Sequence, residues 1–154
     1  MIAQLAAWTF DEKDGARIEP TLGRLADEHR FVLRDARVLS WAVETGRPAA
    51  RRVYSVPLTD AIDDIVWGLF LGQVLYGDER SRSAPLAAIG IPAKVLRRLR
   101  LVLRPGRSGL IVIGDDDSVQ QLADALGPGD PDVRIEVPGD VHAALAPFNR
   151  RSAG

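Results

Sequence analysis

Ile2-Ala-Gln-Leu-Ala-Ala-Trp-Thr-Phe10 is the stretch that decides the fold. Both faces of a strand formed by this stretch would be apolar, because Leu5 and Ala7 would point to one face and Ala6 and Trp8 to the other. A strand with two apolar faces is typical of one that is covered on both sides. We therefore expect this stretch to be a central strand of a sheet.

A helix is predicted directly after this strand. Ile18, Leu22 and Leu25 recur at helical spacing behind an acidic opening. Pro20 is expected to mark the start of the regular helix, since proline is tolerated in the first turn.

A hairpin is predicted next. Residues 31–43 alternate as a long strand does, Glu44-Thr-Gly-Arg47 supplies turn residues, and a second strand is expected over residues 51–57.

The C-terminal part repeats the order strand, helix, strand. Gly109-Leu-Ile-Val-Ile-Gly114 is a compact apolar strand, residues 118–126 predict a short helix, and residues 133–137 predict the last strand. Two such units indicate a split βαβ arrangement.

Two helices are expected between these units, over residues 60–76 and residues 91–102. The fold class is therefore predicted to be α+β, a ferredoxin-like split βαβ sandwich with an inserted hairpin and two central helices. We expect one domain over residues 1–146, with the insertion at about residues 48–104 and a flexible tail over residues 147–154.

Composition limits the function. The chain has 154 residues, of which 46% are hydrophobic and 27% charged, as in one ordinary soluble domain. A formal net charge of -1 predicts no nucleic-acid partner, and the absence of cysteine excludes disulfides and thiolate chemistry. The start of the sequence lacks the basic region of a signal peptide, so we expect a cytoplasmic protein.

Several motifs occur in an order that resembles a known family. They are Leu33-x-Asp35-Ala36-x-Val38, Gly68-x-x-x-Gly72 with Leu75-Tyr76-Gly77, Gly90-Ile91, and Leu103-x-Pro105-Gly106-x-Ser108-Gly109-Leu110. This order is similar to a family of small bacterial proteins of unknown function, often labelled predicted membrane proteins, with a glycine-rich hydrophobic middle. The resemblance implies no catalytic residues. The middle of this chain is short and interrupted by acidic residues, which argues against insertion in a membrane.

The central apolar segment, residues 65–76, is the first candidate site. Glycines one turn apart allow another helix to approach closely, and the aromatic residues beside them favour an interface. The expected interface residues are Trp67, Gly68, Phe70, Leu71, Gly72 and Leu75. The alternatives are packing on the protein's own sheet and contact with lipid.

A run of basic residues is the second candidate: Lys94, Arg97, Arg98, Arg100, Arg104 and Arg107. Lys94, Arg97, Arg98 and Arg100 lie on an amphipathic helix that would suit an anionic surface. A solvated face, or ion pairs with Asp60, Asp63 and Asp64 of the same or a neighbouring subunit, is the preferred interpretation.

Gly114-Asp-Asp-Asp-Ser118 joins a strand to a helix, and three acids there would suit a hard cation or cap the helix. We expect capping, with the same device at Asp11-Glu-Lys-Asp14. His29 and His142 have no spaced second ligand, so neither a metal site nor a cofactor is predicted.

The sequence thus favours a non-catalytic module that forms a homo-oligomer or binds a protein partner through its central helices. The alternatives are a small-molecule-binding module or enzyme of the ferredoxin-like class, and a peripheral membrane protein.

Overall fold

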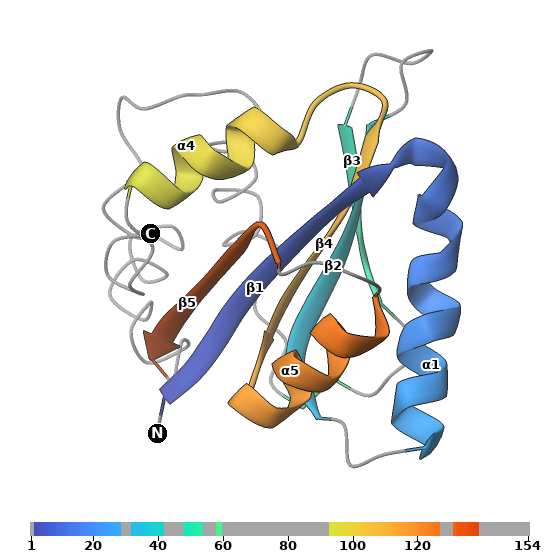
Figure 1. The fold of residues 1–154 in the computed structure, drawn as a ribbon, viewed down its shortest axis with the longest axis vertical. Helices are drawn as coiled ribbons and strands as arrows, with labels where there is room; N and C mark the ends of the chain where they lie inside the picture. The colour runs from blue at the N-terminus through green and yellow to red at the C-terminus, as the bar shows by residue number, and fades with distance from the viewer. Residues whose placement is uncertain are drawn as a thin grey trace, which may run out of the picture.

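The computed structural model describes residues 2–28, 32–41, 48–53, 58–59, 93–126 and 131–138. They form an α+β fold built on a five-stranded antiparallel sheet (Figure 1). The strands are β1 (Ile2–Asp11), β2 (Leu33–Trp41), β3 (Pro48–Arg52), β4 (Arg107–Gly114) and β5 (Val133–Pro138). The helices are the 3₁₀ helix η1 (Glu12–Arg17), α1 (Ile18–Glu28), α4 (Ala93–Val102) and α5 (Asp116–Ala125).

The strand order is β3-β2-β4-β1-β5, which places β1 inside the sheet. In the register, Leu5 of β1 lies opposite Ile113 of β4 on one side and Ile135 of β5 on the other. Leu5 and Ala6 are both buried although they point to opposite faces of the sheet. The prediction of a central strand covered on both sides is confirmed.

Helices α1 and α5 lie on the same face of the sheet (Figure 1). Leu22 of α1 and Leu122 of α5 are fully buried in one cluster with Trp8 and Leu110 from the strands below them. These helices are amphipathic, so their apolar sides meet the apolar side of the sheet and exclude water from it.

The opposite face of the sheet is buried as well and carries the apolar side chains of Ile111 and Ile113. Leu103, just after α4, packs on this face, because a Cβ built on Gly109 would lie only 2.8 Å from Leu103 Cδ2. Helix α4 lies beside β5, apart from α1 and α5 (Figure 1). The absence of a side chain at Gly109 therefore lets the α4 segment approach the sheet closely.

The order of the predicted elements agrees with the described part of the chain, but several boundaries were wrong. Strand β4 and helix α5 each begin two residues earlier than predicted. Helix α1 begins at Ile18, so Pro20 is its third residue, still within the first turn where its missing N–H costs no hydrogen bond. Strand β3 begins at Pro48 rather than at residue 51, because proline is accepted as the first residue of an edge strand. The predicted helix over residues 60–76 and the tail over 147–154 lie outside the described residues.

Candidate functional site

The predicted interface of Trp67, Gly68, Phe70, Leu71, Gly72 and Leu75 lies outside the described residues, as do His29 and His142. The candidate sites in the described part of the chain are helix α4, the start of α5, and the surface between α1 and α5.

Helix α4 is amphipathic, as its sequence predicts. Val95 and Leu99, one turn apart, are buried against the body of the protein. Lys94, Arg97 and Arg98 are exposed, and their spacing of three and four residues places them on the outer face. The outer face of this helix therefore carries only positive charge.

Leu101 lies one turn beyond Arg97 and Arg98 on that outer face and is 67% exposed. A single exposed leucine is common on protein surfaces. This one follows three exposed cations at helical spacing, so the face combines positive charge with an apolar side chain. We call Lys94, Arg97, Arg98 and Leu101 the α4 face.

Cations of the α4 face have no acidic neighbour among the residues that the structure describes. Lys94, Arg97 and Arg98 form no ion pair there. Arg100, predicted to belong with them, is only half exposed and has a partner of its own, so it is not part of this face. Arg107 also leaves the basic run, because its Nη1 binds Asp11 Oδ1 at 2.6 Å.

Helix α5 is capped as predicted. Asp115 Oδ1 accepts a hydrogen bond of 2.7 Å from the Ser118 backbone N–H, and Asp116 and Asp117 occupy the first turn, where the helix dipole favours acids. Ser118 Oγ accepts from the Val32 backbone N–H at 3.0 Å and so joins the cap to the start of β2. In the described residues no three His, Cys, Asp or Glu side chains are grouped to hold a metal ion.

Asp11 does not cap the helix that follows it, so the expectation of a second capping residue was wrong. It precedes η1 but makes no side-chain cap hydrogen bond. Arg107 stands directly opposite it on β4 and takes its carboxylate instead. The 2.6 Å contact with Arg107 thus replaces the cap hydrogen bond that the sequence predicted.

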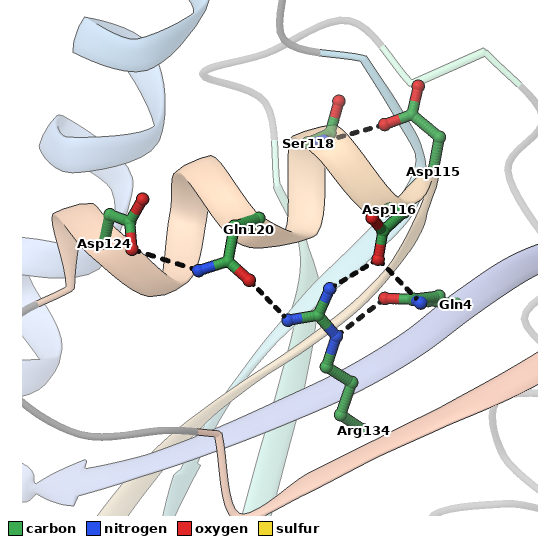
Figure 2. A network of polar contacts seen from close by, with 7 residues as sticks. All are labelled: Gln4, Asp115, Asp116, Ser118, Gln120, Asp124 and Arg134. Atoms are coloured by element: carbon green, nitrogen blue, oxygen red, sulfur yellow. Dashed lines mark hydrogen bonds and ion pairs between the residues drawn. The ribbon is translucent and has the colours of Figure 1, made fainter.

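Arg134 of β5 is the centre of a polar network beneath α5 (Figure 2). Its Nε donates to Gln4 Oε1 at 2.7 Å, its Nη1 to Gln120 Oε1 at 2.9 Å and its Nη2 to Asp116 Oδ1 at 2.7 Å. Gln4 Nε2 donates to the same Asp116 oxygen at 2.9 Å. Each guanidinium nitrogen has a protein partner, so this arginine fastens α5 to β1 and β5 and offers little to a ligand.

Strand β2 carries two buried charged residues, and strand β3 carries an exposed ion pair. Asp35 and Arg37 point to the same face of β2, both are buried, and both have interaction partners. Asp35 belongs to the motif Leu33-x-Asp35-Ala36-x-Val38, but the sequence predicted no functional role for either charge. At the sheet edge, a 2.7 Å contact with Glu19 raises the pKa of the Arg51 guanidinium, through their hydrogen bond and the attraction between their charges.

Two hollows lie along the line where α1 meets α5. The first, of about 370 Å³, is formed by Phe10, Asp14, Arg17, Ile18, Thr21, Ala125 and Leu126. The second, of about 470 Å³, is formed by Arg24, Leu25, Glu28, Gln121, Asp124 and Ala125. Ala125 borders both, so we describe them together as the α1–α5 groove. Its walls are apolar at the base and charged at the rim.

Compared with protein-family models, with curated proteins and with solved structures, the chain finds no match. Among the helices that the structure describes, none combines the length and apolar character needed to cross a bilayer.

Proposed function

We propose that the chain is a non-catalytic, cytoplasmic protein-binding module that assembles with itself or with a protein partner. The observation that carries the proposal is the α4 face, where exposed Leu101 stands beside the cations Lys94, Arg97 and Arg98. Burial of a leucine by a partner removes apolar area from water, which is favourable by about 25 cal/mol per Å². Acidic groups on the same partner would pair with the cations and fix its orientation.

The distribution of charge favours a protein over a nucleic acid as this partner. A net charge of -1 gives no overall attraction to a polyanion, whereas α4 carries only bases and α5 only acids. Opposite charges gathered on separate helices give the molecule two surfaces that are complementary to each other. A second copy of the chain meets this requirement.

We propose that the central segment extends the contact surface. Gly68 and Gly72 are four positions apart, the spacing of one helical turn, and Trp67, Phe70, Leu71 and Leu75 are the apolar residues near them in the sequence. This segment precedes α4 in the chain, so the two surfaces belong to the same insertion between the outer strand–helix–strand units.

The proposed fold is a ferredoxin-like split βαβ sandwich. Support comes from four strands in the order β5-β1-β4-β2, all antiparallel, with α1 after β1 and α5 after β4 on one face. Strand β3 is a fifth strand added at the edge beside β2. Membership of the bacterial family with a glycine-rich middle is part of the same proposal and rests on the order of its motifs.

Self-association is tested by sedimentation velocity of the full chain over a range of concentrations. Arg98→Glu should lower the oligomer fraction, because it reverses one charge of the α4 face. Lys13→Glu is the matched control, since Lys13 is an exposed cation on η1 and the charge changes by the same amount. Gly72→Arg tests the central segment in the same assay. A wild type that sediments as a monomer at every concentration, with no protein partner recovered, would refute the proposal.

Peripheral attachment to an anionic membrane is the second candidate function, favoured by the same exposed leucine beside cations. It predicts that the full chain binds vesicles containing phosphatidylserine, in proportion to their negative charge. Arg97→Gln with Arg98→Gln would weaken that binding. Self-association in the absence of lipid argues for the protein partner instead.

A further inference from the structure

We propose that the α4 face of one copy docks into the α1–α5 groove of a second copy, head to tail. This inference rests on the proposed function and specifies which surface receives the α4 face.

Leu101 is the apolar part of the docking element. Its side chain is 67% exposed, while Val95 and Leu99 on the opposite side of the same helix hold α4 to the protein. Arg97 and Arg98 lie one turn before it, so a partner that covers the leucine also meets both guanidinium groups.

The groove offers the matching shape. Leu25 and Ala125 lie at the base of its larger hollow, a wide and open depression of about 470 Å³ against which an aliphatic side chain can lie. Phe10, Ile18 and Leu126 continue the apolar base into the smaller hollow.

Charge at the rim of the larger hollow also matches. Glu28 of α1 and Asp124 of α5 are exposed there, against one cation, Arg24. Asp124 Oδ1 also accepts a hydrogen bond from Gln120 Nε2 at 3.1 Å (Figure 2), and Glu28 has a partner of its own. Helix α5 contains no basic residue and adds exposed Asp117 in its first turn, whereas Asp116 is bound by Arg134. Cations of the α4 face therefore meet mainly acids when Leu101 lies against this hollow, and Arg24 fixes the orientation by repelling them from its own side.

The two surfaces do not meet within one molecule. Helix α4 lies beside β5, whereas the groove is formed by α1 and α5 over the other face of the sheet (Figure 1). The contact therefore joins the α4 face of one copy to the α1–α5 groove of another. Such a pair still has one free groove and one free α4 face, to which further copies can bind. Such a heterologous contact repeats and gives rings or open chains rather than closed twofold dimers.

The contact is expected to be weak. Helix α4 has 10 residues, so it is roughly 15 Å long and covers a few hundred Å² on each partner, below the roughly 1,000 Å² total of a stable interface. Oligomers of graded size that grow with protein concentration are expected, instead of one fixed assembly.

Reversing the charge on each surface separately gives a decisive test. Arg98→Glu places an acid on the α4 face, and Asp124→Arg places a base on the rim of the groove. In either variant alone the altered contact joins like charges, and we expect the association constant to fall by more than about tenfold. Asp124 is exposed in the last turn of α5, where a base suits the helix dipole, and the variant loses only the exposed hydrogen bond from Gln120, so it should fold.

An equimolar mixture of the two variants should associate again. The acid introduced on the α4 face of one variant then meets the base introduced at the groove of the other, and the unaltered surfaces form the original contact in alternate positions. Sedimentation velocity of each variant and of the mixture measures this, and circular dichroism checks that both variants are folded. Association that is lost in each variant alone and recovered in the mixture indicates a head-to-tail contact. If two α4 faces met symmetrically instead, Asp124→Arg alone would associate as the wild type does.

Other outcomes separate the two proposals. If Asp124→Arg associates as the wild type does while Arg98→Glu does not, the groove is not the receptor, although self-association through α4 stands. If the mixture stays monomeric, the head-to-tail contact is wrong. If the wild type is monomeric at all concentrations, and binds phosphatidylserine vesicles or nothing, the proposed function fails together with this inference.

Discussion

Asp115 and Asp11 have similar sequence contexts, since each ends a strand and precedes a helix, yet they bind different partners. Asp115 lies before an α-helix, whose third amide is free to donate to its carboxylate at 2.7 Å. Asp11 lies opposite Arg107 in the β1–β4 register, and that cation takes its carboxylate. Local sequence shows a capping residue but not the residue across the strand, so only one of the two capping predictions was confirmed.

Replacement of Asp115 by alanine tests the cap. Asp115→Ala should lower the free energy of unfolding by about 1 kcal/mol, because the Ser118 amide loses its acceptor. Asp115→Asn should retain most of the stability, since an amide oxygen also accepts. Urea unfolding followed by circular dichroism measures both variants.

Asp117→Ala is the control, because Asp117 is an exposed neighbour in the first turn of α5 and is not the cap residue. It should change the free energy of unfolding by less than about 0.5 kcal/mol. Equal losses for Asp115→Ala and Asp117→Ala would show that the helix dipole, not the cap, accounts for the effect.

Element order was predictable because each element carries its own periodicity. Alternation identified β2, apolar residues on both faces identified β1 and β4, and three- and four-residue spacing identified α1 and α4. The spacing of apolar residues predicts a helix, but it does not show which surface of the protein that helix packs against. Placement of the α4 segment depends on Gly109, one element away, where a missing side chain leaves room for Leu103.

Substitution at Gly109 tests this placement. A Cβ there would lie 2.8 Å from Leu103 Cδ2 and 3.4 Å from the Trp8 carbonyl oxygen, so Gly109→Ala forces the leucine to move. We expect the free energy of unfolding to fall by about 1–3 kcal/mol, as for other overpacked cores. Denaturant titration gives the value.

A double-mutant cycle separates this clash from a general effect of alanine in the strand. In a Leu103→Ala background the obstructing atom is gone, so Gly109→Ala should cost clearly less than in the wild type. If the two costs are equal, Leu103 does not hold the α4 segment in the way described.

At the scale of the whole molecule, long-range polar contacts and charge distribution were not visible in the sequence. Arg134 binds Gln4, 130 positions away, and Arg107 binds Asp11, 96 positions away. The basic run was predicted from sequence as one group, but Arg107 is paired with Asp11 and Arg100 is half-buried with a partner of its own. Lys94, Arg97 and Arg98 remain on the outer face of α4, and Arg104 is exposed just beyond the end of this helix. The net charge of -1 hides the separation of bases on α4 from acids on α5.

That separation predicts how salt affects self-association. The Debye length falls from about 10 Å at 0.1 M to about 3 Å at 1 M ionic strength, so attraction between exposed cations and acids is largely screened at the higher value. Burial of Leu101 is affected much less by sodium chloride. The association constant of the wild type, measured by sedimentation, should therefore fall as sodium chloride rises. Leu101→Ser, which keeps the charged part of the contact, should associate more weakly than the wild type at every salt concentration. Association that is unchanged or strengthened by sodium chloride would mean that apolar burial alone joins the copies, and the charges of α4 and α5 would then have no part in it.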